Sequence, residues 1–267
     1  MITLTKIETD FLRPRETRFY PQDNNPAFEE WFLDNYDETR NKSDRIFLPI
    51  LTTELNKQYL RNKRLRRDVD NYFRELDKSK KYFLIVQHDD GVLFDMHGAD
   101  VKIFGMGCKG DVQLPLVCQP HKYKFMETDR PIFASFIGSI THPIRQKLVD
   151  ELKDKHGYLI STEQTSLHLY CWILSKSKYV ICCRGYGKTS FRIAEALQYG
   201  ATPIYLSDEF LYSIGCIKAV SIEGIIAFLN AARETIEEDH YLNQQTFNQH
   251  YTYEAVSNMI YENLHSL

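Results

Sequence analysis

The sequence predicts an α/β protein built on a parallel sheet, and two stretches carry this prediction. Residues 178–208 run in the order strand, glycine loop, helix, glycine, strand, with Gly200 as the stop of the helix. This is the order of one βαβ unit, whose two strands lie parallel in the same sheet. The second stretch, residues 82–86, is an apolar run that leads directly into polar and acidic residues. Open α/β sheets place their ligands at such strand ends.

The composition is that of an ordinary globular protein. The chain has 267 residues, of which 43% are hydrophobic and 26% charged, enough for one large or two modest domains. The net charge of −3 gives no reason to expect a nucleic-acid partner. No apolar run is long enough for a transmembrane anchor, residues 1–15 lack a signal-peptide core, and the six cysteines show no C-x-x-C spacing. We therefore expect a cytoplasmic protein with reduced cysteines.

The N-terminal region adds helices and strands to this pattern. Residues 27–36 predict a helix with an apolar side, residues 45–51 a strand, and residues 53–80 one long, charged helical stretch. Asp68 and Asp70 have the D-x-D form that can hold a metal, but they fall inside this helical stretch. Alternate residues of a helix face different ways, so we expect no metal site there.

A polar, acidic cluster follows the strand at residues 82–86. His88, Asp89 and Asp90 are candidates for a general base or for contacts with an acceptor, because they lie at the carboxyl end of a buried strand. The competing interpretation is a plain strand-end turn in which an aspartate caps the backbone. The spacing of these residues does not favour a metal site.

The glycine loop after residue 183 is the second candidate site. Gly185 and Gly187 allow the backbone to turn tightly and to approach a ligand. Thr189 or Ser190 can cap the helix that follows, and the first N–H groups of a helix suit a phosphate.

Charged residues flank this loop on both sides. Arg184 and Arg192 add bidentate donors for a phosphate, and Glu195, three residues after Arg192, offers an acceptor for a ribose diol. The competing interpretation is a βα turn with a solvated, charged face.

Two familiar nucleotide motifs fit this loop only in part. The Walker A pattern would need its first glycine where Cys182 stands, which argues against a P-loop phosphotransferase. The Rossmann pattern G-x-G-x-x-G fits Gly185 and Gly187, but Ser190 takes the third position. Asp208 stands where a ribose-binding acid of an NAD site would stand, so a dinucleotide site remains an alternative.

A more specific pattern covers residues 184–204, RGYGKTSFRIAEALQYGATPI. This stretch resembles the core motif of the exostosin-like glycosyltransferases, R-G-x-G-x-[TS]-S-x-R-x-x-E-A-L-x-x-G-x-x-P-I. Residues 82–91 are similar to the run H-F-F-V-A-T-H-D-W-G of plant members, with Asp90 in place of the tryptophan. Residues 110–115 resemble K-D-V-x-[IL]-P. Residues 136–139 with Arg145 resemble the segment FFRG…R, with an isoleucine in place of the first arginine.

The resemblance implies a fold and the part of the chain that binds each substrate. The family's GT-B fold has two Rossmann-like domains that face a central cleft. Residues 1–125 would form an N-terminal acceptor-binding domain, and residues 126–250 a C-terminal domain that binds the nucleotide sugar. Residues 251–267 would form a C-terminal helix that packs back on the N-terminal domain.

The resemblance also implies an activity, an inverting transfer of a sugar from a UDP-sugar to a hydroxyl of a glycan acceptor. Asp89, or its neighbours His88 and Asp90, would deprotonate the acceptor, and cations would stabilise the departing diphosphate, so we expect neither a metal nor another cofactor. Xylose is the first guess for the sugar, because a short chain suits a pentose. The expected donor-binding residues are Gly138, Ser139, Arg145, Arg184, Gly185, Tyr186, Gly187, Thr189, Ser190, Phe191, Arg192 and Glu195.

Two other classes of protein stay open. An NAD-dependent oxidoreductase would use the loop of Gly185 and Gly187 together with Asp208. A non-catalytic carbohydrate-binding protein would keep the same surfaces and would tolerate the loss of Asp89.

Overall fold

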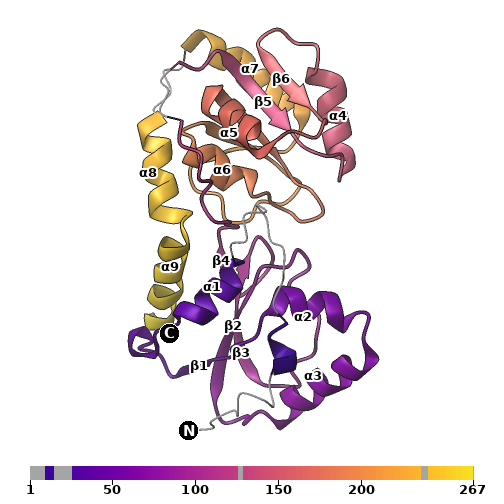
Figure 1. Cartoon of the computed structure of the whole chain (residues 1–267), viewed down its shortest axis with the longest axis vertical. Coiled ribbons are helices and arrows are strands. Elements are labelled where there is room, and N and C mark those ends of the chain that lie inside the picture. Colours follow the sequence, from indigo (N-terminus) through magenta and orange to yellow (C-terminus); the bar gives the residue numbers. More distant parts are fainter. Residues whose placement is uncertain (1–9, 15–25, 126–128, 236–239, 267) are drawn as a thin grey trace. The chain divides into compact units, whose positions relative to one another are not determined.

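The structure, a computed structural model, describes residues 10–14, 26–125, 129–235 and 240–266 (Figure 1). The chain divides into two compact units. Unit 1 comprises Met1–Leu114 and Tyr253–Leu267, and unit 2 comprises Pro115–Thr252. Each unit contains one parallel sheet, so the predicted α/β class with two Rossmann-like halves is confirmed.

The sheet of unit 1 has four parallel strands in the order in which they occur along the chain. The strands are β1 (Arg45–Phe47), β2 (Lys81–Val86), β3 (Asp100–Met106) and β4 (Val112–Leu114). Strand β1 is shorter than the predicted strand at residues 45–51, which contains a proline, a residue that cannot donate to a strand ladder.

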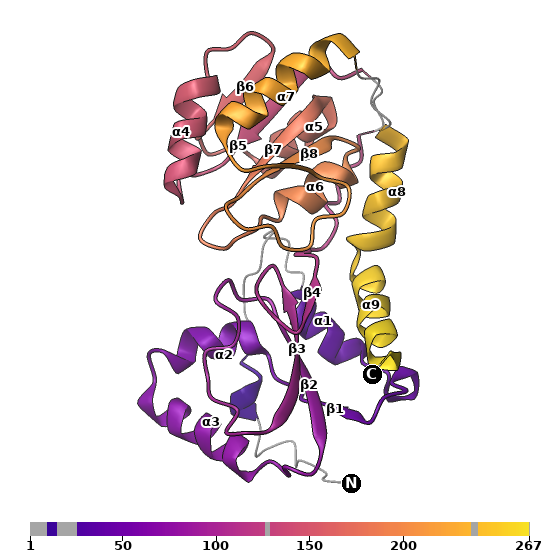
Figure 2. The ribbon, with the colours of Figure 1, turned by 180° about the vertical axis from the view of Figure 1, so that it is seen from behind.

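Helices cover both faces of this sheet (Figure 2). On one face, α2 (Thr52–Tyr59) and α3 (Lys63–Glu75) pack on Leu84 and the other inward side chains of β2. On the opposite face lie α1 (Phe28–Asn35) and α9 (Tyr253–His265), whose rings at Phe28 and Tyr253 meet edge to face at 5.2 Å. The Tyr261 hydroxyl of α9 also accepts a hydrogen bond of 2.9 Å from the backbone N–H of Asp37.

The expected long helical stretch at residues 53–80 is two helices. Helix α2 ends at Tyr59, and the Asn62 side chain then accepts hydrogen bonds from the N–H groups of Arg64 and Leu65. An asparagine in this position caps the start of a new helix and stops the previous one from continuing.

The sheet of unit 2 has five parallel strands in the order β6–β5–β7–β8–β9. The strands are β5 (Ile132–Ile137), β6 (Tyr158–Ser161), β7 (Ser177–Cys183), β8 (Thr202–Leu206) and β9 (Ile217–Ala219). The helices are α4 (Pro143–Leu152), α5 (Leu167–Lys176), α6 (Arg192–Gln198), α7 (Ile222–Thr235) and α8 (His240–His250). Helices α4 and α7 lie over one face of the sheet, and α5 and α6 over the other (Figures 1 and 2).

The strand order locates the position where a ligand is expected. From β5 the chain moves outward to β6 and then crosses back to β7 on the other side of β5. In doubly wound sheets of this order, ligands bind at the carboxyl ends of the two strands that flank this reversal. The segments that leave β5 and β7 therefore form the natural site of unit 2.

The predicted helix stop at Gly200 is confirmed. Gly200 has a φ of +73° and follows Tyr199, the C-cap residue of α6. A Cβ atom there would lie 2.8 Å from Nη2 of Arg130, which donates to the carbonyl of Tyr199. Both the backbone conformation and the close guanidinium require glycine.

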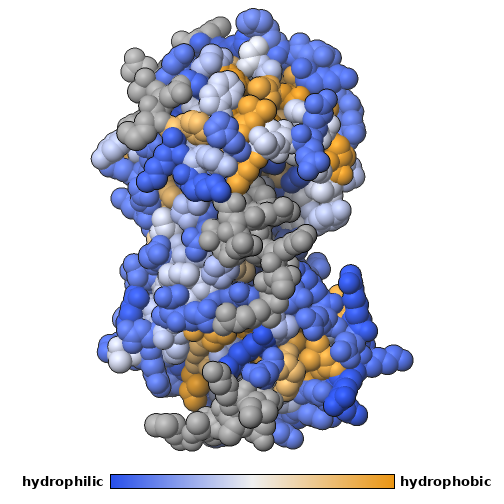
Figure 3. Space-filling view, viewed as in Figure 1, coloured by the Kyte–Doolittle hydropathy of each residue, from blue (hydrophilic) through white to orange (hydrophobic). Residues whose placement is uncertain are grey.

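The surface is largely polar, with separate apolar patches (Figure 3). The exposed apolar side chains include Leu169 and Trp172 on α5. In the described part of the chain, every helix is too short or too polar to cross a membrane.

Candidate functional site

The loops after β5 and β7 meet at the carboxyl edge of the unit 2 sheet, and Arg145 joins them. Its guanidinium donates from Nη1 to the Ser139 carbonyl at 2.9 Å, and from Nε and Nη2 to the carbonyls of Arg184 and Cys183 at 2.9 and 3.1 Å. The sequence motifs thus identified two loops that the structure brings together. Burial and the charge of Arg192 lower the pKa of Arg145, which places a second cation close by.

Arg192, the first residue of α6, contributes this second cation. Its Nη2 donates to the carbonyl of Ile137 at 2.5 Å, and its guanidinium lies 5.0 Å from the centre of the Phe136 ring. The Arg145 guanidinium lies 5.9 Å from the same ring. Two positive groups are therefore held by carbonyl dipoles and one aromatic ring at the reversal between β5 and β7.

Two glycines allow the guanidinium groups to lie this close to the backbone. A Cβ atom on Gly138 would lie 2.6 Å from Nη2 of Arg192. A Cβ atom on Gly185 would lie 3.0 Å from Nη2 of Arg145 and 3.1 Å from the Thr141 hydroxyl. The sequence suggested that Gly185 makes room for a ligand, and the structure shows that it also makes room for the protein's own arginine.

Arg184 pairs with a carboxylate at the end of the next strand. Its Nη1 donates to Oδ1 of Asp208, and this bond lowers the pKa of the Asp208 carboxyl. Nζ of Lys188 lies 3.6 Å from the other oxygen of Asp208. Asp208, the residue that an NAD site would use for ribose, therefore neutralises part of the positive charge at this edge.

The remaining residues of the glycine loop differ in exposure. Tyr186 is 80% exposed, whereas Thr189 is buried. The Ser190 hydroxyl accepts a hydrogen bond of 3.3 Å from the N–H of Arg192, as expected for a residue before a helix. Gly187 and Phe191 lie in the same loop, between β7 and α6.

Glu195 lies in the interior of unit 2. Its Oε1 lies 2.8 Å from Nε2 of His121, and its Oε2 accepts a bond of 2.7 Å from the Tyr170 hydroxyl. The carboxylate is 2% exposed, so a ribose could reach it only after the side chains that cover it have moved. No sequence pattern marked His121 as a site residue.

In unit 1, the loop after β2 is a tight turn. The N–H of Gly91 donates to the carbonyl of His88 at 2.9 Å, and the N–H of Asp90 lies 3.2 Å from Nδ1 of His88. Asp89 and Asp90 are exposed, and His88 is partly buried. The backbone thus forms a strand-end turn, as in the competing interpretation of the sequence. This turn presents both carboxylates to solvent.

A buried carboxylate that the sequence did not single out lies next to this turn. Oε1 of Glu29 accepts bonds of 2.6 Å from both the N–H of Gln87 and the hydroxyl of Thr53, and Oε2 accepts one of 2.9 Å from the N–H of Thr53. Burial raises the pKa of Glu29 to about 7, although these bonds oppose the shift. Acidic residues are common in the first turn of a helix, so its position in α1 gave no signal.

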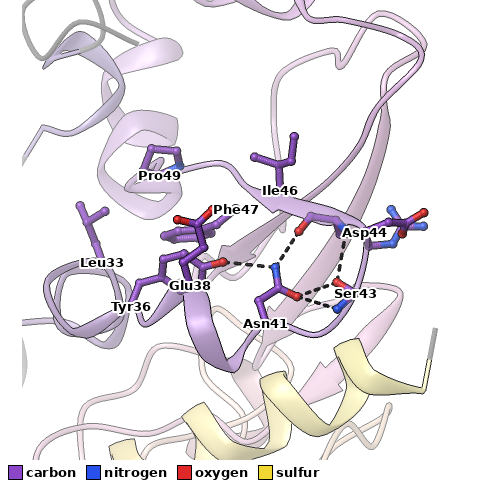
Figure 4. Close-up of a pocket in the computed structure, with 10 residues that line it drawn as sticks. Leu33, Tyr36, Glu38, Asn41, Ser43, Asp44, Ile46, Phe47 and Pro49 are labelled. Carbon is purple, nitrogen blue, oxygen red and sulfur yellow. Dashed lines mark hydrogen bonds between the residues drawn. The ribbon is translucent and has the colours of Figure 1, made fainter. Parts of the chain in front are cut away.

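A separate pocket of about 450 Å³ lies beside the edge strand β1 (Figure 4). The Asn41 side chain in this pocket donates to the Tyr36 hydroxyl at 3.2 Å and to the Arg45 carbonyl at 2.7 Å. None of the residues expected to bind a donor or an acceptor lines it. Among the residues that the structure describes, no group of three or more His, Cys, Asp or Glu side chains is arranged to hold a metal ion.

Three solved structures are similar to this chain, each at 10% sequence identity. A GtfA/B complex has a TM-score of 0.43 over 89% of this chain and 60% of its own. AviGT4, a glycosyltransferase involved in avilamycin A biosynthesis, has a TM-score of 0.41 over 74% of this chain and 76% of its own. The pneumococcal O-GlcNAc transferase GtfA, in complex with UDP and GlcNAc, has a TM-score of 0.41 over 88% and 59%.

Comparison by sequence finds a family model and a relative that each match part of the chain. The Exostosin GT47 domain matches residues 101–213, a range that includes the loops after β5 and β7 but not Glu29 or the turn after β2. The Probable glycosyltransferase At5g03795 of Arabidopsis thaliana is 33% identical over 90 residues, which are 32% of this chain and 16% of that protein. The match therefore spans only about a sixth of that relative's length. The resemblance to the exostosin-like glycosyltransferases that the sequence motifs indicated is confirmed over residues 101–213.

Proposed function

We propose that the chain is a glycosyltransferase that moves a sugar from a UDP-sugar to a hydroxyl of a glycan acceptor. The observation that carries the proposal is the cluster of guanidinium groups at the reversal of the unit 2 sheet. Arg145 and Arg192 are fixed there by backbone carbonyls, and Arg184 begins the loop after β7. A departing diphosphate develops negative charge on its oxygens, and preorganised donors of this kind stabilise such charge without further reorganisation.

In this proposal the reaction is a direct, inverting displacement. Asp89, or one of its neighbours His88 and Asp90, removes the proton from the acceptor hydroxyl. The acceptor oxygen attacks the anomeric carbon from the side opposite to the leaving group while the bond to the diphosphate oxygen breaks. The electron pair of that bond leaves with UDP. The arginines stabilise the negative charge of the diphosphate, so the reaction needs neither a metal nor another cofactor.

The proposal assigns the donor to unit 2 and the acceptor to unit 1. In unit 2, the loop residues that contact the nucleotide are Gly138, Ser139, Arg184, Gly185, Tyr186, Gly187, Thr189, Ser190 and Phe191. Glu195 binds the ribose in addition to His121 and Tyr170, because a carboxylate can accept about four hydrogen bonds. Xylose is the first sugar to test, and the cytoplasmic location stays a prediction from the sequence.

The first test is calorimetric titration of the chain with UDP, GDP, NAD and ATP, each with and without EDTA. UDP binding that EDTA does not change supports the metal-free donor site, and activity assays with UDP-xylose and other UDP-sugars then follow. NAD binding without UDP binding would overturn the proposal in favour of an oxidoreductase.

The second test is Arg192→Ala, which we expect to abolish transfer. Its matched control is Arg67→Ala on α3, where the side chain is 69% exposed and lies in unit 1. Near-normal transfer by the Arg192→Ala protein would contradict the diphosphate assignment.

A further inference from the structure

A series of buried polar side chains leads from the segment before β5 to the arginine cluster. It begins at His121, whose Nε2 lies 2.8 Å from Oε1 of Glu195. The other oxygen of Glu195 accepts a bond of 2.7 Å from the hydroxyl of Tyr170 on α5. Arg192 begins the same helix, α6, three residues before Glu195. Its positive charge also opposes the rise in the pKa of the Tyr170 hydroxyl that burial and Glu195 cause. The series ends where Nη2 of Arg192 meets the carbonyl of Ile137, at 2.5 Å.

Burial makes the members of this series depend on one another. Both the His121 ring and the Glu195 side chain are at most 2% exposed. A buried carboxylate is tolerated only where hydrogen-bond donors or positive groups surround it. Removal of one donor therefore leaves the desolvation free energy of the carboxylate uncompensated. Glu195 therefore constrains the position of Tyr170 and, through it, that of Arg192.

His121 is itself fixed in place by backbone contacts. Its N–H donates to Oε1 of Gln198 at 3.1 Å, and its carbonyl accepts from Nε2 of the same side chain at 3.0 Å. Two residues later, the carbonyl of Tyr123 accepts a bond of 2.7 Å from the hydroxyl of Tyr199. The segment around His121 is thus bound to Gln198, the last residue of α6, and to Tyr199, which follows it.

We propose that His121 is a positioning residue of the donor site, which acts through Glu195 and Tyr170 to hold Arg192 beside Gly138. This inference rests on the proposed function, because it assumes that Arg192 contacts the diphosphate. It differs from a plain structural role in one respect. A residue that only attaches the segment to α6 would affect stability, whereas a positioning residue changes the affinity for a nucleoside diphosphate in a protein that remains folded.

The test compares four chains by calorimetric titration with UDP, with thermal unfolding as the check of the fold. His121→Leu removes the bond to Glu195, and we expect UDP affinity to fall about tenfold, as expected when a buried polar group loses a partner. His121→Gln keeps an N–H donor at a similar distance from the backbone and should restore the affinity to within about twofold. The matched control is Tyr199→Phe, which keeps the ring next to His121 but removes the bond to the Tyr123 carbonyl; its UDP affinity should equal that of the wild type.

The outcomes separate this inference from the proposed function. If the wild type binds no UDP, the proposed function falls and the inference falls with it. If the wild type binds UDP and His121→Leu binds it equally well, only the inference is overturned. An equal loss in His121→Leu and Tyr199→Phe would also overturn it, since attachment of the segment alone would then explain the effect.

A second route covers the case in which His121→Leu does not fold. Tyr170→Phe breaks the next bond of the series from the side of α5, and it too should lower UDP affinity about tenfold. An unchanged affinity for this variant would overturn the inference. In a Glu195→Gln background the effect of Tyr170→Phe should shrink to about twofold, because both changes act on one coupled network.

Discussion

The carboxyl edges of the two sheets share a geometry and differ in charge. The edge in unit 2 carries Arg145, Arg184 and Arg192, each bonded to carbonyls or to Asp208. The corresponding edge in unit 1 carries the exposed Asp89 and Asp90 and the buried Glu29, which accepts a bond from the N–H of Gln87. Parallel strands supply the same scaffold in both cases, and the side chains that follow the strands decide which charge it presents. A transfer reaction needs both kinds of site, a base for the acceptor and cations for the leaving group.

The strongest test of this comparison removes the proposed base. Asp89→Asn should lower the transfer rate by a factor of about 10² to 10⁴ while UDP affinity remains unchanged, because a general base contributes to the rate only. Parallel measurements on His88→Gln and Asp90→Asn identify which of the three acts as the base. Asp68→Asn on α3 is the control. If only Asp89→Asn is fully active, the base is one of its neighbours. If all three variants are fully active, the base does not lie at this edge of the sheet.

The next test disturbs the cations without changing any charge. Gly138→Ala would place a Cβ atom 2.6 Å from Nη2 of Arg192, so the guanidinium must move. We expect UDP affinity to fall about 30-fold or more, a loss of about 2 kcal/mol. Gly224→Ala on α7 is the control, because the nearest atom to its Cβ would be the Ser221 hydroxyl at 3.6 Å. Equal UDP binding by both variants would show that the position of Arg192 does not matter.

A third test concerns the buried carboxylate of unit 1. Because the pKa of Glu29 is raised from 4.5 to about 7, the stability that its protonated form contributes is fully present below pH 4.5 and is lost as the pH rises through 7. Relative to Glu29→Gln, the wild type should therefore lose up to about 3 kcal/mol of unfolding free energy between pH 4.5 and pH 8. Urea unfolding at several pH values measures this, with Glu54→Gln as the control. Parallel curves for the wild type and Glu29→Gln would contradict the raised pKa.

The smallest expected effect comes from Asp208. Its side chain is 64% exposed and competes with a phosphate for Arg184. Asp208→Asn should raise UDP affinity about two- to fivefold at low salt, with a smaller gain at high salt, since exposed ion pairs contribute at most about 1 kcal/mol. Titrations of this variant and of Glu209→Gln at two salt concentrations provide the comparison. A weaker binding of UDP to Asp208→Asn would mean that Asp208 orients Arg184 rather than competing for it.

The local parts of the fold were predictable from the sequence. The strand, loop, helix and glycine of residues 178–200 follow from short-range periodicity and from the conformational demands of Gly200, and the structure confirms them. The division of the stretch at residues 53–80 was missed, although the capping residue Asn62 is a local signal. The apolar pattern continues through this stretch and favours one helix, but the side-chain cap at Asn62 starts a new helix there.

The contacts within the candidate site were less predictable. The motifs predicted that Arg145 and the loop after β7 belong to one site. They did not predict that Arg145 donates to three backbone carbonyls. Glu29 and His121 escaped notice because their partners lie far away along the chain, at Gln87 and Glu195. A long-range bond of this kind leaves no periodicity in the sequence.

The packing of α9 against α1 has a consequence for the order of folding. Unit 1 takes its last helix from residues that follow the whole of unit 2. On the ribosome, unit 2 is complete once residue 252 has emerged, whereas Phe28 must wait for Tyr253 and the rest of α9. The second unit to be translated can thus be the first to finish, and the aromatic side of α1 lacks its partner on α9 until α9 has emerged.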